Sequence, residues 1–257
     1  MQFDRIISVR NDRTVFRDGS TCIKVSSEDY PASAILSEAM NMAAAAEAGL
    51  SVPKLHEVNV FEKNRLITYE YIAGGPIGCC DKDSPDFRTE RLNLLINAQL
   101  AVNGASCPEC IRRPSTAAGF GIDFPARNEH GQADEFELIQ NAFNGGGKAA
   151  FAGNALCHGN LAPENVILTP AGKLYVIDWA YAYPGVPESD AAICFLKLLL
   201  TGGERTAREY LELYFKRACP HSSDAVTALL PFAASMLYNR EKAAGRKLLL
   251  SIIKKYQ

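Results

Sequence analysis

The stretch "LCHGNLAPENVILTPAGKLYVIDWA", residues 156–180, gathers small polar side chains around two short apolar segments. The segments "NVILTP" and "KLYVID" are rich in β-branched and aromatic residues, and Ala171-Gly172 separates them. This pattern predicts a β-hairpin with a two-residue turn. With that turn, Val166 lies opposite Ile177, and Asn165 lies opposite Asp178 with the two Cβ atoms about 5 Å apart.

A carboxylate beside a carboxamide at the end of a buried hairpin has two explanations. Asn165 and Asp178 offer oxygen atoms, which suit Mg²⁺ held by one or two protein groups and by the phosphates of a substrate. A structural Asp–Asn hydrogen bond that closes the hairpin is the simpler explanation on the hairpin alone, because buried polar groups need partners whether or not they are functional.

The N-terminal part of the chain reads as strands and one helix. "TVFRDG" and "STCIKVS" flank an Asp18-Gly19 turn, and residues 32–50 form an Ala-rich segment that predicts a helix stopped by Gly49. Strand character returns over residues 51–72 and breaks at Gly74-Gly75-Pro76, the expected hinge. We therefore expect an α+β fold with a strand-rich N-lobe, 1–72, and a mostly helical C-lobe, 73–257.

Helical periodicity marks several segments of the larger C-terminal part. These segments are residues 88–105, 133–143, 188–202, 204–218 and 223–256. The stretch 113–134, rich in Pro, Gly and Asn, predicts a loop. "NGGGK", residues 144–148, lacks the spacing of a phosphate-binding loop and predicts a flexible connection.

Composition and charge narrow the classes of function. The 257 residues are 47% apolar and 22% charged, with a formal net charge of −2, so a general nucleic-acid binder is not expected. No apolar run is long enough for a membrane helix and the N-terminus lacks a signal layout, which predicts a cytoplasmic protein without membrane partners. Of the eight cysteines, Cys107 and Cys110 form an isolated "CPEC" pair, and we expect ordinary reduced thiols.

Basic residues recur near the C-terminus and predict a solvated basic face rather than a binding surface. They are Arg240, Lys242, Arg246, Lys247, Lys254 and Lys255, against Glu241.

Two further features sharpen the hypothesis from the hairpin. His158-Gly159-Asn160 comes directly before it, so the chain reads H-G-N-x-x-x-x-N and then I-D-W. Far upstream, Lys24 lies in the strand "TCIKV" and Glu38 in the following helix. A lysine and a glutamate placed in this way can pair and hold an ammonium over nucleotide phosphates.

This order of segments resembles the aminoglycoside phosphotransferase and choline kinase-like family, which has a two-lobed protein kinase-like fold. The family pattern H-G-D-x-x-x-x-N, then I-D-W, then G-D-P-x-x-D, corresponds here to "HGNLAPEN", "VIDWA" and "GVPESD". The N-terminal segments "TVFRDGSTCIKV", "GLSVPKLHEV" and "ITYEYIAGG" also fit, and the resemblance is weakest over residues 77–155.

The resemblance implies ATP and Mg²⁺ as cofactors. Lys24 would hold the α- and β-phosphates and Glu38 would orient it, under an N-terminal hairpin that covers the phosphates. The backbone of Glu70, Tyr71 and Ile72 would meet the adenine.

The resemblance also implies the metal and catalytic positions. Asn165 and Asp178 would hold Mg²⁺. His158 and Asp190 would brace the catalytic loop, and Asn160 occupies the position of the catalytic base. The transferred phosphoryl group would go to a hydroxyl of a small molecule.

Three positions depart from the family pattern. Asn160 replaces the catalytic Asp, Val186 replaces the Asp of G-D-P, and Asn103 lies where relatives often carry His. A carboxamide can accept a hydrogen bond from a hydroxyl but cannot usefully take its proton, and that loss typically costs about 10²–10⁴-fold in rate. A slow phosphotransferase, a nucleotide-binding pseudokinase that acts through partners, and an engineered substitution at position 160 therefore remain open.

The acceptor substrate is not specified by these motifs. Antibiotics, choline, amino sugars and nucleosides all remain open. An acidic cleft would favour a cationic acceptor, and Glu188, Glu204, Glu209 and Glu212 are the residues that could form one.

Overall fold

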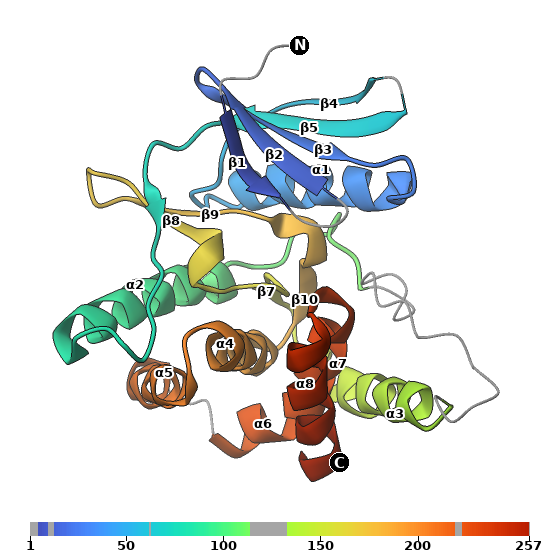
Figure 1. Cartoon of the computed structure of the whole chain (residues 1–257), viewed down its shortest axis with the longest axis vertical. Helices are drawn as coiled ribbons and strands as arrows, with labels where there is room; N and C mark the ends of the chain where they lie inside the picture. The colour runs from blue at the N-terminus through green and yellow to red at the C-terminus, as the bar shows by residue number, and fades with distance from the viewer. Residues whose placement is uncertain (1–4, 10–12, 62, 114–132, 219–222, 257) are drawn as a thin grey trace.

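The computed structural model describes residues 5–9, 13–61, 63–113, 133–218 and 223–256. Figure 1 shows a β-sheet with one helix under it at the N-terminal end of the molecule, and a group of helices at the opposite end. Small two- and three-stranded sheets lie between them. This is the α+β, two-lobed arrangement that the sequence predicted.

A five-stranded antiparallel sheet forms the N-terminal end. Its order is β1-β2-β3-β5-β4, built from β1 (Arg5–Val9), β2 (Arg13–Asp18), β3 (Thr21–Ser26), β4 (Leu55–Phe61) and β5 (Asn64–Glu70). The predicted hairpin is confirmed, because Asp18 pairs with Thr21 and Gly19 adopts a φ of 55°. β3 is an inner strand, so Lys24 has neighbours on both sides, Val15 and Ile67.

The helix α1 (Ala32–Glu47) packs beneath the sheet and ends as its sequence predicts. Gly49 adopts a φ of 85°, and the amides of Gly49 and Leu50 donate to the carbonyls of Ala46 and Ala45. This left-handed stop satisfies the last carbonyls of the helix. On the other side of α1, Asn41 donates from Nδ2 to the carbonyl of Trp179, 3.0 Å away. The helix therefore joins the N-terminal sheet to the segment after the central hairpin.

The central hairpin is present, but its predicted register is wrong by one residue. β8 (Val166–Leu168) pairs with β9 (Leu174–Val176) so that Val166 lies opposite Val176. The turn is longer than predicted, because the Gly172 amide donates to Thr169 O and the Thr169 and Lys173 backbones pair across it. Gly172 supplies the left-handed residue, with a φ of 78°, as in hairpins with a three-residue loop.

The corrected register changes the partner of Asn165. Asn165 lies in a 3₁₀ turn, η2 (Pro163–Asn165), and its carbonyl accepts from the Ile177 amide. β6 (Gly75–Pro76), from the expected hinge, pairs with β8 as the third strand of this sheet.

Helices form most of the C-terminal part, as the periodicity predicted. They are α2 (Pro85–Gly104), α3 (Ala133–Ala150), α4 (Pro187–Thr201), α5 (Glu204–Arg217), α6 (Ser223–Ala228), α7 (Leu230–Leu237) and α8 (Ala243–Tyr256), with 3₁₀ turns η3 (Trp179–Tyr181) and η4 (Tyr238–Arg240). Most of the loop predicted over residues 113–134 lies outside the described residues. No helix in the described ranges combines the length and apolar character needed to cross a membrane.

The prediction of a flexible connection at "NGGGK" is wrong, because α3 continues through it. A Cβ on Gly146 would come within 2.6 Å of Phe232 Cβ on α7. Gly146 therefore serves close packing between α3 and α7, and this outweighs its low helix propensity.

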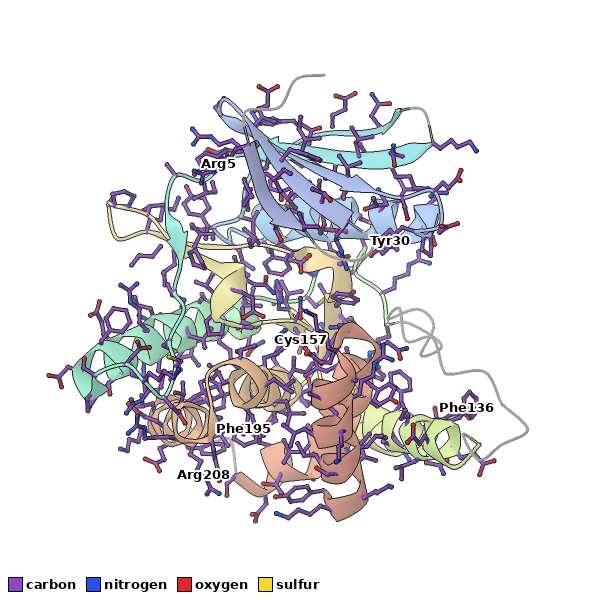
Figure 2. The ribbon with its side chains drawn as sticks, in the orientation of Figure 1. Arg5, Tyr30, Phe136, Cys157, Phe195 and Arg208 are labelled. Carbon is purple, nitrogen blue, oxygen red and sulfur yellow. The ribbon has the colours of Figure 1, made fainter. Side chains whose placement is uncertain are left out.

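A second two-stranded sheet holds the start of the central stretch in place. β7 (Ala155–Cys157) pairs with β10 (Tyr183–Gly185), so Cys157 lies opposite Tyr183. Figure 2 shows Cys157 in the middle of the molecule, between the N-terminal sheet and the C-terminal helices. The buried apolar side chains form one cluster that runs from α1 to the C-terminal helices.

Candidate functional site

Asp178 takes an unusual backbone conformation at the end of the central stretch. It follows β9 with φ 68° and ψ 58°, the left-handed region that non-glycine residues seldom adopt. Trp179 follows immediately and is fully buried, with its indole Nε1 donating to Val176 O at 3.0 Å. These contacts keep the turn in place.

Lys24 joins the N-terminal sheet to this turn. Its Nζ lies 2.5 Å from Glu38 Oε1 and 2.9 Å from Asp178 Oδ1. Burial disfavours the ammonium, but the carboxylates of Asp178 and Glu38 outweigh that effect and raise the pKa of Lys24. The pair expected between β3 and the next helix is thus formed, and Asp178 completes it.

Asn160 lies between the two residues predicted as metal ligands. Its Nδ2 donates to Asp178 Oδ2 at 3.0 Å, and its carbonyl accepts from Asn165 Nδ2 at 2.7 Å. Asn165 and Asp178 therefore do not pair directly as the two-residue hairpin predicted, and Asn160 connects them. Both asparagines are buried.

Gly159 allows the chain to pass close to the turn. Its φ is 70°, and a Cβ there would collide with the carbonyl oxygen of Tyr181. The glycine of the H-G-N sequence is thus required by its backbone conformation and by this close approach.

Asp190 and His158 make hydrogen bonds that fix the backbone of the loop at residues 158–160. Asp190, in the first turn of α4, accepts from the amides of His158 and Gly159 at 2.7 and 2.8 Å, and from Asn103 Nδ2 at 3.0 Å. His158 Nε2 donates to Ile177 O at 3.1 Å. Burial lowers the pKa of His158, although the nearby carboxylates of Asp190 and Asp178 act against it. The lowered pKa keeps the imidazole neutral at neutral pH, and its single ring proton is then on Nε2, the nitrogen that faces the Ile177 carbonyl.

The structure adds residues that sequence reasoning missed. Arg13, at the start of β2, lies with Nη1 3.8 Å from Asp178 Oδ1 and donates from Nη2 to the Tyr181 hydroxyl at 3.4 Å. Arg240 donates from Nη1 to Gly159 O at 3.1 Å, with its Cζ 3.3 Å from the centre of the Tyr181 ring. Neither arginine stands in a motif, so no signal in the sequence marks it.

The prediction of a solvated basic face is therefore wrong for Arg240. The side chain is half-buried against Gly159 and Tyr181, with Nε and Nη2 inaccessible to solvent, because η4, a short turn between α7 and α8, directs it toward them. Other residues of that face, such as Lys242 and Lys247, are exposed as predicted.

Comparison with known protein families identifies a family whose model covers all of these site residues except Arg240. A model of the phosphotransferase enzyme family matches residues 5–226, which include Lys24, Asn160 and Asp178. The chain belongs to this phosphotransferase family.

Solved structures show the same fold at low identity. Aminoglycoside-3'-phosphotransferase of type VIII is 18% identical, with a TM-score of 0.68 over 90% of this chain and 93% of that chain. A choline/ethanolamine kinase family protein from Mesorhizobium loti is 18% identical, with a TM-score of 0.61 over 100% and 88%. A thermostable mutant of aminoglycoside phosphotransferase APH(4)-Ia, in a ternary complex with ADP and hygromycin B, is 15% identical, with a TM-score of 0.68 over 98% and 92%. No curated protein sequence matches the chain.

The segment that the family resemblance assigns to adenine directly follows β5, an inner strand of the five-stranded sheet. Glu70 ends β5, and Tyr71 and Ile72 come next. The Tyr71 amide already donates to Ser20 O at 2.8 Å, and Arg17 stacks on the Tyr71 ring at 4.1 Å. The Glu70 amide donates to Lys54 O at 2.9 Å, so neither the Glu70 nor the Tyr71 amide is free to donate to a base.

The oxygen atoms of Asp178 and Asn165 fit a magnesium ion whose remaining ligands are phosphate oxygens. Asp178 supplies a carboxylate, and Asn165 keeps its Oδ1 available because Nδ2 makes the bond to Asn160. Within the described ranges, no three His, Cys, Asp or Glu side chains gather as a complete metal site. One carboxylate and one carboxamide match the preference of Mg²⁺ for few protein ligands plus phosphate oxygens.

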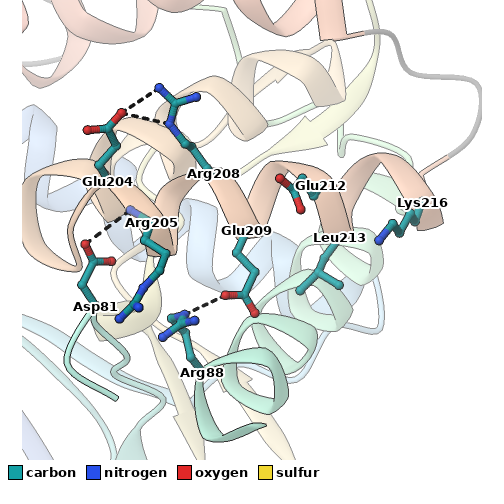
Figure 3. A pocket seen from close by; sticks show the side chains of 9 residues that line it. All are labelled: Asp81, Arg88, Glu204, Arg205, Arg208, Glu209, Glu212, Leu213 and Lys216. Atoms are coloured by element: carbon teal, nitrogen blue, oxygen red, sulfur yellow. Dashed lines mark hydrogen bonds and ion pairs between the residues drawn. The ribbon is translucent and has the colours of Figure 1, made fainter. Parts of the chain in front are cut away.

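An open pocket on the outer side of the helices contains none of these residues. Figure 3 shows it between α5 and the start of α2, where Glu204 pairs with Arg208 and Glu209 with Arg88. Its other charged side chains are Asp81, Arg205, Glu212 and Lys216. Three of the four glutamates expected in an acidic cleft lie here, among an equal number of basic and acidic groups, so they form no acidic substrate cleft. Figure 1 shows α5 at the opposite end of the molecule from the sheet whose strand β3 carries Lys24.

The cysteines in the described ranges are free thiols, as predicted. They are Cys22, Cys79, Cys80, Cys107, Cys110, Cys157 and Cys194.

Proposed function

We propose that the protein binds ATP with Mg²⁺ beside Lys24 and transfers the γ-phosphoryl group to a hydroxyl of a small molecule in the cytoplasm. The observation that carries the proposal is the buried Lys24–Glu38–Asp178 cluster beside the Asn160 loop. Related folds support it: the APH(4)-Ia mutant was solved with ADP and hygromycin B, and the amicoumacin kinase hAmiN with AMP-PNP and Ca²⁺. The proposed division is an N-lobe of residues 1–72 and a C-lobe of residues 73–257.

The contacts of each residue support the role proposed for it. Glu38 holds the Lys24 ammonium in position for nucleotide phosphates, and the backbone around Glu70–Ile72 faces the base. Asp178 and Asn165 are the proposed metal ligands, and bound Mg²⁺ would withdraw charge from the phosphate oxygens. Asp190 fixes the loop by accepting from the amides of His158 and Gly159, and the neutral His158 anchors it to β9 through the Nε2 bond to Ile177 O.

Asn160 decides how fast such a reaction runs. Its Nδ2 donates to Asp178, so the carboxamide Oδ1 is the atom left to accept a hydrogen bond from the acceptor hydroxyl. It cannot act as a general base, and positioning and electrostatics would have to supply the catalysis. We therefore expect a slow enzyme.

The test is calorimetric titration with ATP and a nonhydrolysable analogue, with and without Mg²⁺. We expect Mg²⁺-dependent binding that Lys24→Met and Asp178→Asn each weaken by about tenfold or more, since each removes a charge from the phosphate and metal positions. Lys63→Met is the matched control, because that lysine lies in the turn between β4 and β5 with a side chain that is 81% exposed. Circular dichroism confirms that the variants are folded. Equal affinity in all four proteins, or no binding at millimolar nucleotide, would refute the nucleotide site.

The second candidate is a pseudokinase that binds nucleotide and acts through partners. Asn160 itself favours this function, because it is a neutral residue that hydrogen-bonds to both Asp178 and Asn165. Asn160→Asp separates the two functions. If the protein is an enzyme slowed by this residue, turnover on hydroxyl substrates should rise by about 10²–10⁴-fold. If nucleotide binds and no substrate is turned over by either form, the pseudokinase is the better description.

A further inference from the structure

Arg13 reaches from the N-terminal sheet to the turn at Asp178. It begins β2, and its side chain is only 8% exposed. Nη1 lies 3.8 Å from Asp178 Oδ1, and Nη2 donates to the Tyr181 hydroxyl at 3.4 Å. Its Cζ also lies 5.3 Å from the centre of the Tyr30 ring. The guanidinium therefore joins the sheet to the segment that follows the central hairpin.

Protein donors already surround the Asp178 carboxylate. Lys24 Nζ lies 2.9 Å from Oδ1, the oxygen that Arg13 also faces, and Asn160 Nδ2 donates to Oδ2 at 3.0 Å. Mg²⁺ needs oxygen ligands at about 2.0–2.1 Å in near-octahedral geometry. A magnesium ion at this carboxylate must therefore share it with three donors or displace one of them.

Of these three donors, Arg13 is the one that a metal ion can displace most easily. Lys24 is held a second time by Glu38, whose Oε1 is 2.5 Å from Nζ, and Asn160 is neutral and does not repel a metal ion. The Arg13 guanidinium lies 3.8 Å from Asp178, well beyond the roughly 2.9 Å of a well-formed hydrogen bond. It acts on the carboxylate mainly through its charge, so it can move away without breaking a short hydrogen bond to Asp178.

The charges of this cluster balance before any metal binds. Asp178 and Glu38 supply two negative charges, and Lys24 and Arg13 supply two positive charges. Burial and the charge of Arg13 act against the Lys24 ammonium, whereas Asp178 and Glu38 outweigh them and raise its pKa. A free magnesium ion would add two positive charges to the balanced cluster and would be repelled by Arg13. Phosphates that arrive with the ion offset this repulsion.

We propose that Arg13 competes with Mg²⁺ for Asp178 and leaves the carboxylate only when a magnesium–nucleotide complex brings phosphate charge to the site. The inference rests on the proposed function for the role of Asp178 as a metal ligand. Arg13 is thus a positioning residue, whose contacts with Asp178 and Tyr181 hold the sheet against the turn in the nucleotide-free protein. The site excludes free Mg²⁺ and selects the metal–nucleotide complex.

The test is calorimetric titration of the full chain with AMP-PNP at saturating Mg²⁺. Arg13→Gln should bind the complex about tenfold more tightly than the wild-type protein, because the competing charge is removed. Tyr181→Phe removes only the hydroxyl that meets Arg13, so it should shift the affinity in the same direction by less, and it carries the test if Arg13→Gln does not fold. Arg5→Gln is the matched control, because Arg5 is an exposed arginine on the neighbouring strand β1.

A second measurement tests the contact without any ligand. The effects of Arg13→Gln and Asp178→Asn on urea unfolding in EDTA should not be additive in the double variant, because the two side chains interact. The effects of Arg5→Gln and Asp178→Asn should be additive.

The outcomes separate this inference from the proposed function. Tighter nucleotide binding by Arg13→Gln, together with non-additive unfolding, supports the competition. Equal or weaker binding by the folded variant, or additive unfolding, overturns the competition while leaving the nucleotide site in place, and weaker binding would make Arg13 a phosphate ligand instead. Absence of nucleotide binding by both the wild-type protein and Arg13→Gln refutes the nucleotide site itself, and the competition with it.

Discussion

At position 160 a carboxamide makes a bond that a carboxylate could not make. Asn160 Nδ2 donates to Asp178 Oδ2 at 3.0 Å, and the Asp178 side chain is only 10% exposed. An aspartate at 160 would place two carboxylates against each other, an arrangement that is unfavourable unless a proton or a cation lies between them. The asparagine therefore stabilises the site without any bound metal.

We predict that Asn160→Asp makes stability depend on divalent cations. Without Mg²⁺ the variant should lose about 1–3 kcal/mol of unfolding free energy, because a donor to Asp178 is replaced by a like charge. Mg²⁺ should recover much of the loss and should affect the wild-type protein less. Urea unfolding of both proteins, with EDTA and with Mg²⁺, measures the difference. An equal response of the two proteins to Mg²⁺ would mean that Asp178 binds no cation beside position 160.

Among the elements, α3 shows how packing overrides local preference. Its glycines predict a break in the chain, yet the helix runs to Ala150. Gly146 faces Phe232 on α7, whereas Gly145 is exposed and has open space where a Cβ would be. The two neighbouring glycines therefore differ in purpose.

This contrast gives a matched pair of substitutions in α3. Gly145→Ala should raise the unfolding free energy by about 0.5–1 kcal/mol, because alanine loses less backbone entropy in a helix. Gly146→Ala should lower it by about 1–3 kcal/mol, since its Cβ would overlap Phe232. Thermal and urea unfolding of the two variants test this. Stabilisation by both would show that α3 does not pack closely on α7.

At the scale of the whole molecule, a buried neutral histidine links stability to pH. The folded protein keeps His158 neutral because burial lowers its pKa below the ordinary histidine value of 6.5, while the unfolded chain takes up a proton near that value. Below this pH the unfolded state binds more protons, so stability falls as the pH falls.

We predict that His158→Gln weakens this pH dependence. Between about pH 7.5 and about pH 5.5 the wild-type protein should lose roughly 1 kcal/mol more unfolding free energy than the variant. The amide of glutamine can still donate to Ile177 O, so the variant is expected to fold. Urea unfolding at the two pH values measures the difference between the proteins, in which the carboxylates common to both cancel. Parallel losses in the two proteins would show that His158 is not the group responsible.

The sequence alone determined the elements whose signals are local. Two of these signals are the turn at Gly19 and the helix stop at Gly49, and a third is the helical periodicity. The order of Lys24, Glu38, H-G-N and I-D-W is another. None required tertiary information, because turn residues and motif spacing can be read directly from the sequence. These signals were enough for the fold and the family.

Only the tertiary structure decided the rest. The hairpin register depended on one extra turn residue stabilised by Thr169 and Gly172. The continuation of α3 depended on Phe232, more than eighty positions away. Arg13 and Arg240 reach Asp178 and Gly159 from opposite ends of the chain. Such contacts leave no local pattern, because a buried arginine and an exposed one look identical until the fold brings their partners together.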